Sequence, residues 1–136
     1  MAEEKPIQAH VAETGESAYA VAIEVSGHTL KGDEPKESGG GNLGPAPYDM
    51  LLAALGECTA MTVRWYALQK QWPLDKVEVD LTHRKENKKD YFTKAITLHG
   101  DKLTPEQRAK LVEIAAKCPV QRTLEGAPVI ETLAAE

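Results

Sequence analysis

The residues of this 136-residue chain that most clearly could do chemistry are its two cysteines, Cys58 and Cys118. A pair of thiols can form a redox couple, contribute to a metal site, or pack as small hydrophobic side chains. Cys58 lies on a predicted buried helix. Cys118 is predicted at the C-terminal end of another helix, where the helix dipole disfavours a thiolate. Spacing alone therefore favours unreactive packing over a paired redox role.

Other chemistry has less support in the sequence. The histidines lie on predicted strands or turns, at His10, His28, His83 and His99. Neither Cys-x-x-Cys nor His-Glu-x-x-His accompanies them, so we expect no metal site. A Gly-x-Ser-x-Gly elbow is also absent from the sequence, which argues against a serine hydrolase. A cysteine–histidine dyad remains open.

The amino-acid composition limits which binding partners and which cell compartment we expect for this protein. Sixteen Lys and Arg stand against twenty-one Asp and Glu, a net charge of −5, which argues against nucleic acid or an anionic membrane as the main partner. The length fits one domain over residues 1–136. Two cysteines do not make a disulfide framework and no signal peptide is recognisable, so we expect reduced thiols and a cytoplasmic location.

The first half of the chain predicts a small sheet followed by a long helix. Alternating apolar residues predict strands at Ile7–Ala12, Ser17–Val25 and His28–Lys31. The glycine-rich and proline-rich segment Gly32–Pro47 is a long loop, and it lacks the Gly-Lys-Ser/Thr ending of a phosphate-binding loop. The helix Pro47–Gln71 is apolar all round in its middle, so it should be buried on all sides, partly by a partner subunit.

The second half predicts a hairpin, a helix and a last strand. Strands are expected around Val77–Thr82 and at Tyr91–His99, joined by a charged turn. Thr104 caps the second helix, which runs toward Cys118, and Val129–Leu133 is expected to close the sheet. The order βββ-α-ββ-α-β places the chain in the α+β class.

At this point the sequence resembles a known family. The run from Gly39 to Cys58, GGGNLGPAPYDMLLAALGEC, followed by Cys118-Pro119-Val120, resembles the OsmC/Ohr family of osmotically inducible and organic hydroperoxide resistance proteins, in its general OsmC-like branch. The resemblance implies an OsmC-like fold in which two chains intertwine as a homodimer, with a long buried central helix. This agrees with the apolar helix.

The resemblance also implies an activity, that of a cysteine-based peroxidase that reduces organic hydroperoxides in the oxidative stress response. Cys58 would attack the peroxide and become a sulfenic acid, and Cys118 would resolve it as a disulfide. A dithiol reductant of the lipoyl type would then restore the thiols. No metal, flavin or other cofactor is implied.

The sequence departs from the family where a cation should activate the attacking thiol. The family arginine of the first hairpin has no counterpart, because no arginine precedes Arg64, and Tyr48 stands where the family has a glutamate. We expect Arg64 to face solvent or pair with another element. The substitute candidates are Arg122, which we prefer, and Lys36, with His28 as a possible base.

An expected substrate pocket leads to a second hypothesis about the function. Tyr48, Met61 and Trp65 could line an apolar pocket for a lipophilic hydroperoxide, although such residues also occur as plain core. A pocket without an activated thiol would make the protein a catalytically weak or inactive OsmC-like dimer that binds small lipophilic molecules.

Overall fold

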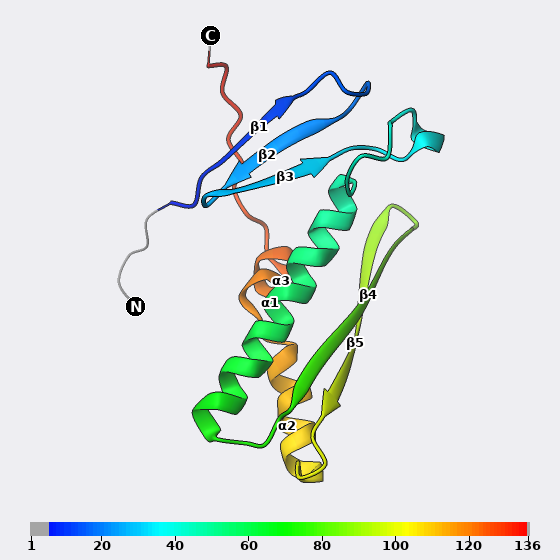
Figure 1. Ribbon diagram of the computed structural model, residues 1–136. Coiled ribbons are helices and arrows are strands. Elements are labelled where there is room, and N and C mark those ends of the chain that lie inside the picture. Colours follow the sequence, from blue (N-terminus) through cyan, green and yellow to red (C-terminus); the bar gives the residue numbers. More distant parts are fainter. Residues whose placement is uncertain (1–5, 136) are drawn as a thin grey trace. The chain divides into compact units, whose positions relative to one another are not determined.

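The computed structural model describes residues 6–135, and it is an α+β protein (Figure 1). Along this part of the chain lie β1 (Ala9–Glu13), β2 (Val21–Val25), β3 (His28–Gly32), the 3-10 helix η1 (Lys36–Ser38), α1 (Pro47–Lys70), β4 (Lys76–Glu86), β5 (Lys89–His99), α2 (Pro105–Ala115) and α3 (Pro119–Glu125). The chain forms two compact units, Met1–Leu51 and Leu52–Glu136, each described by itself. One domain over residues 1–136 stays a prediction.

The N-terminal unit opens with the predicted three-stranded meander. Strands β1, β2 and β3 pair antiparallel in that order, with Val25 opposite His28 across the tightest turn. Ser26 and Gly27 both have positive φ angles, 49° and 81°. This is the backbone that a two-residue hairpin turn needs to match the twist of its strands.

The loop after β3 is organised by a buried carboxylate. Asp33 is 4% exposed and accepts hydrogen bonds from the Ser17 hydroxyl and from the backbone N–H groups of Glu34, Gly41 and Leu43. Gly40 passes so close to the Glu34 carbonyl that a side chain would collide with it. The glycine-rich segment therefore wraps an internal carboxylate, which agrees with its interpretation as a turn rather than a phosphate cradle.

Helix α1 has the predicted start and ends one residue earlier than predicted, but it is not buried on all sides within one chain. Leu55, Thr59, Val63 and Ala67 form its buried stripe, one every four residues. Met61, Trp65 and Leu68 are between 59% and 64% exposed. One face of α1 therefore packs into its own unit and an apolar face remains open, so the predicted burial of that face by a partner subunit stays a prediction.

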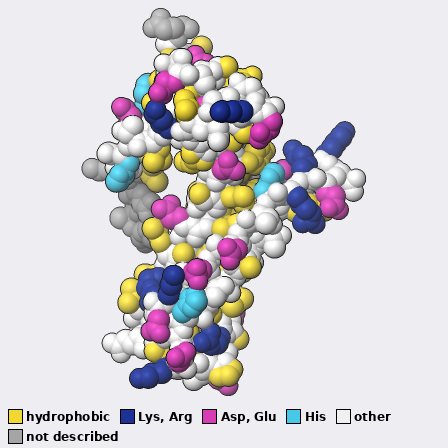
Figure 2. Space-filling view, turned by 45° about the vertical axis from the view of Figure 1, so that its right-hand side comes forward, with side chains coloured by type: hydrophobic (Ala, Val, Ile, Leu, Met, Phe, Trp, Pro, Cys, Tyr) yellow, Lys and Arg dark blue, Asp and Glu magenta, His cyan; other side chains and the backbone are white. Residues whose placement is uncertain are grey.

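The buried stripe of α1 packs into one hydrophobic core with the hairpin and α2. The buried members are Val63, Ala67, Leu74, Leu103, Leu111 and Ala115. Strands β4 and β5 pair over their full length, from Lys76 opposite His99 to Glu86 opposite Lys89. The charged turn forms the tip of this hairpin, where Lys and Arg side chains gather (Figure 2).

Helix α2 begins as predicted and ends earlier. Thr104 and Gln107 form a reciprocal capping box with Pro105 at the first helical position. The helix stops at Ala115, and a new helix, α3, begins at Pro119. Proline disfavours helical angles in the residue before it, so Cys118 is extended, with φ −67° and ψ 147°. Cys118 thus lies at the start of a helix, not at the end of one.

The predicted last strand is wrong for the described chain. Residues 127–135 form neither strand nor helix, and Val129, Ile130 and Leu133 are 84% to 88% exposed. Alternating apolar residues form a strand only beside a neighbouring strand that completes their hydrogen bonds, and this segment has none in residues 6–135. Among those residues, no helix is long and apolar enough to cross a membrane.

Leu111 gives a test of the core. It is completely buried, so Leu111→Ala should lower the free energy of unfolding by about 2–5 kcal/mol through lost contacts and a cavity. Val112, the next residue on α2, is 49% exposed, so Val112→Ala should change it by less than about 0.5 kcal/mol. Urea denaturation measures both, and equal losses would contradict this core.

Asp33 gives a test of the loop. Burial raises the pKa of Asp33, but the Glu34, Gly41 and Leu43 N–H groups and the Ser17 hydroxyl lower that pKa by more. Because the folded-state pKa is depressed, the carboxylate stabilises the loop above about pH 4, and this is lost as the pH falls through that pKa. Asp33→Asn should therefore speed amide exchange of Gly41 and Leu43 at neutral pH. The exposed control Glu37→Gln should leave amide exchange unchanged. If Gly41 and Leu43 exchange as slowly in Asp33→Asn as in the wild type, the Asp33 carboxylate does not hold the loop.

Candidate functional site

The two thiols, sixty positions apart in sequence, meet in the C-terminal unit where the middle of α1 lies beside the start of α3. Both are free cysteines, Cys58 partly buried and Cys118 completely buried. The Val120 N–H donates to Cys58 Sγ at 3.4 Å, and Cys58 lies near enough to Cys118 to help lower the pKa of the Cys118 thiol. The structure thus brings the two predicted reactive residues into contact.

Local sequence explains how the sulfur atoms are held. Thr59, completely buried on the inner stripe of α1, places its hydroxyl 3.4 Å from Cys118 Sγ. The same hydroxyl contacts the Leu55 carbonyl at 2.8 Å, one turn back. Pro119 opens α3 with an angle suited to a first helical turn, so the N–H groups of Val120 and Gln121 point back toward the two sulfurs.

A cation that the sequence analysis did not select lies beside this cluster. Lys94 of β5 donates from Nζ to Thr59 Oγ1 at 2.9 Å and to the Ala115 carbonyl at 2.7 Å. Ala115 is the last residue of α2, where the negative end of the helix dipole favours a positive charge. Lys94 is partly buried, and within residues 6–135 no carboxylate forms an ion pair with it.

These neighbours lower the pKa of the Cys118 thiol. Burial raises the pKa of Cys118, but hydrogen bonds from Thr59, the Gln121 N–H and Cys58 and the charge of Lys94 outweigh it. The pKa of Cys118 therefore lies below its usual value. This corrects the expectation that a helix C-terminus would disfavour the thiolate there, because Cys118 precedes the first turn of α3.

The cations selected from the sequence lie elsewhere. Arg122 is exposed on α3, and among the described residues no hydrogen bond joins its side chain to either thiol. Lys36 of η1 and His28 of β3 are exposed in the N-terminal unit, so their roles stay predictions. Arg64 donates to the Leu74 carbonyl at 2.8 Å, in the loop between α1 and β4.

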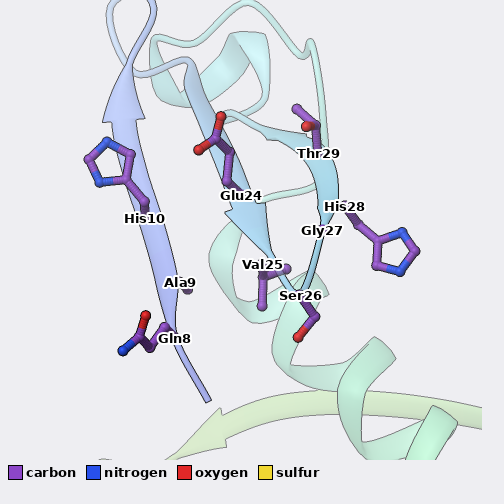
Figure 3. Close-up of a pocket in the computed structure, with 9 residues that line it drawn as sticks. All are labelled: Gln8, Ala9, His10, Glu24, Val25, Ser26, Gly27, His28 and Thr29. Atoms are coloured by element: carbon purple, nitrogen blue, oxygen red, sulfur yellow. The ribbon is translucent and has the colours of Figure 1, made fainter. Parts of the chain in front are cut away.

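The histidines of the first sheet do not form a cluster. His10 lies on β1 and His28 on β3, and their side chains point away from one another around the hollow in Figure 3. The register agrees, since His10 pairs with Glu24 and His28 with Val25, which face opposite sides of the sheet. Within residues 6–135 no group of His, Cys, Asp and Glu could hold a metal ion.

The predicted pocket residues divide between two hollows. Met61 and Trp65 line an open apolar hollow on α1, together with Ala60, Arg64, Leu68 and Val77. Tyr48 lines a hollow of the N-terminal unit with the loop that precedes α1. The structure therefore groups two of the three predicted residues.

One pattern in the sequence could have identified Lys94 as a cation near the site. Residues Phe92, Ile96 and Leu98 alternate along β5 and are partly buried, and Lys94 falls in the same register, opposite Leu81. A lysine on the apolar face of a half-buried strand is unusual, because its charge must find partners there.

The chain belongs to the OsmC-like protein family, whose model matches residues 39–133. This range includes both cysteines, α1, the β4–β5 hairpin and Lys94. Comparison with curated protein sequences gives no match.

Solved structures share the fold at low sequence identity. The OsmC-like protein of Mycoplasma pneumoniae superposes with a TM-score of 0.76 at 17% identity, over 91% of this chain and 90% of that one. An organic hydroperoxide resistance protein OsmC from Legionella pneumophila gives 0.67 at 18%, over 92% and 93%. The organic hydroperoxide resistance protein OhrB of Bacillus subtilis gives 0.61 at 15%, over 90% and 92%.

The unequal burial of the thiols gives a test of the site. Alkylation of the native reduced protein with iodoacetamide should modify Cys58 and spare Cys118, because only Cys58 is partly exposed. After denaturation both should react. Peptide mass spectrometry identifies the modified residue, and preferential modification of Cys118 in the native protein would contradict this geometry.

Proposed function

We propose that the protein is a thiol-dependent peroxidase that reduces organic hydroperoxides, with Cys58 attacking and Cys118 resolving. The observation that carries the proposal is the closeness of a partly exposed thiol, Cys58, to a buried thiol, Cys118, whose pKa is lowered. Attack belongs to Cys58 because a hydroperoxide can reach it, whereas Cys118 is completely enclosed.

The neighbouring Cys118 thiolate supplies the base for the attacking thiol. When Cys118 carries the charge, it accepts the Cys58 proton, which leaves Cys58 as thiolate and Cys118 as thiol. The Val120 N–H, at 3.4 Å, stabilises the new charge on Cys58.

The reaction then balances in two steps. Cys58 S⁻ attacks the terminal oxygen of ROOH, the O–O bond breaks, and the leaving RO⁻ takes the Cys118 proton to give ROH. Cys118 S⁻ next attacks the sulfur of the Cys58 sulfenic acid and forms a disulfide, and hydroxide leaves and gains a proton from solvent. An external dithiol, proposed to be of the lipoyl type, reduces the disulfide by two electrons and becomes a disulfide itself.

The proposal includes a homodimer and a cytoplasmic location. Met61, Trp65 and Leu68 leave an apolar face on α1 uncovered, and a second copy of the chain is the partner that the family resemblance implies. The cytoplasm is proposed because free thiols persist in a reducing compartment.

A second candidate function keeps the hollow and drops the redox chemistry. The open apolar hollow at Met61 and Trp65 would let a catalytically weak dimer bind small lipophilic molecules.

Stoichiometric oxidation separates the two candidates. Excess cumene hydroperoxide should consume two thiols per chain and give one intrachain Cys58–Cys118 disulfide, seen as a loss of two hydrogens by intact-mass spectrometry. Cys58→Ser should abolish the reaction, and Cys118→Ser should stop at a sulfenic acid that a dimedone probe traps.

Turnover is then measured with dihydrolipoamide as reductant, and both single cysteine variants should lose it. Survival of both thiols in excess hydroperoxide would exclude the peroxidase and leave the binding function.

A further inference from the structure

The charge of Lys94 is held in an unusual setting. Its ammonium group is partly buried on the inner face of β5, and its two acceptors are neutral oxygens of Thr59 and Ala115. A buried cation is stable when an anion compensates it. With no carboxylate paired to it in residues 6–135, the group nearby that can become an anion is the Cys118 thiol, which contacts the same Thr59 hydroxyl.

Thr59 can link the two because a hydroxyl has one proton to donate and two lone pairs that accept. Lys94 occupies one lone pair. When Cys118 is a thiol, its S–H donates to the other lone pair and the Thr59 proton points to the Leu55 carbonyl. When Cys118 is a thiolate, the Thr59 proton turns to the sulfur, and the ammonium group beside the oxygen strengthens that donation.

The second contact of Lys94 holds the end of α2, which precedes Cys118 in the chain. The Ala115 carbonyl ends α2 three residues before Cys118, and Lys94 holds it at 2.7 Å. One side chain from β5 therefore holds both the Thr59 hydroxyl of α1 and the end of α2 that leads into the Cys118 turn.

We propose that Lys94 is a positioning residue for the cysteine pair: acting through Thr59, it holds the negative charge on Cys118 and so prepares Cys118 to attack the Cys58 sulfenic acid. This inference rests on the proposed peroxidase function. The step it governs is formation of the sulfur–sulfur bond and departure of hydroxide from Cys58. This role of Lys94 requires no contact with the substrate.

Several charged groups on the elements around Cys118 are exposed to solvent. Glu57 of α1 and Arg122 of α3 are exposed. On α2, Glu113 forms exposed ion pairs with Lys110 and Lys117. Two other cations of these helices are part-buried, Arg64 of α1 and Arg108 of α2, and both donate to backbone carbonyls. On β4 the residue opposite Lys94 is the apolar Leu81.

The first experiment titrates Cys118 alone. In a Cys58→Ser background, the ultraviolet absorbance of the thiolate is followed against pH. Lys94→Met should raise the midpoint by about one pH unit, because the compensating charge is lost. Lys94→Arg should keep it near the background value, and the exposed control Lys102→Met should not move it. An unchanged midpoint in Lys94→Met overturns the inference.

Thr59→Val removes the hydroxyl and keeps Lys94, so it tests whether Lys94 acts on Cys118 through Thr59. It also replaces Lys94→Met as the test variant if Lys94→Met does not fold. Its midpoint should also rise. A midpoint equal to that of the background would show that Lys94 does not act through Thr59.

The second experiment follows the resolving step with both cysteines present. After one equivalent of cumene hydroperoxide, the decay of trappable sulfenic acid should be about tenfold slower in Lys94→Met at neutral pH and should recover as the pH is raised. Unchanged decay at all pH values overturns the inference. If the wild-type chain forms no sulfenic acid, the peroxidase proposal fails, and the titration still decides whether Lys94 acts on Cys118.

Discussion

The arrangement of the C-terminal unit depends on one constraint, the placement of a positive charge on the inner face of a hairpin. Lys94 stands in the row of Phe92 and Ile96, where a charge is tolerated only if oxygen atoms surround it. The Thr59 hydroxyl and the Ala115 carbonyl supply those atoms from two different helices. Satisfying this lysine therefore fixes α1 and the end of α2 against β5, and the Cys118 turn lies where those elements meet.

The sequence predicted the local structure well because its signals are local. Pro47 at a helix start, the Thr104 capping box and the alternation on both sides of the charged turn each act within a few residues, and the corresponding elements are found there. The last strand at Val129–Leu133 failed because a strand depends on a neighbour that the sequence cannot supply. Hydrophobicity indicated that the middle of α1 is apolar all round, but it does not reveal which side of the helix its own chain covers.

The site was predicted in part. The cysteines were found from the family resemblance, but the position of Cys118 relative to a helix depended on where α2 ended, and Pro119 reset that end by three residues. The cation was sought near the cysteines in sequence and along the N-terminal loop, at Arg122 and Lys36. Lys94 lies thirty-five positions from Thr59, and only the pairing of β4 with β5 and their packing on α1 bring it close.

The contact between Cys58 and Cys118 also has a consequence for the unfolded chain. A covalent bond between them would close a loop of about 60 residues that contains β4, β5 and α2. On the chain-entropy model, a closure of that length removes freedom from the denatured ensemble worth about 4 kcal/mol. Oxidation of the pair would then raise the thermal stability of the entire C-terminal unit, so the oxidised chain would unfold at a higher temperature than the reduced one.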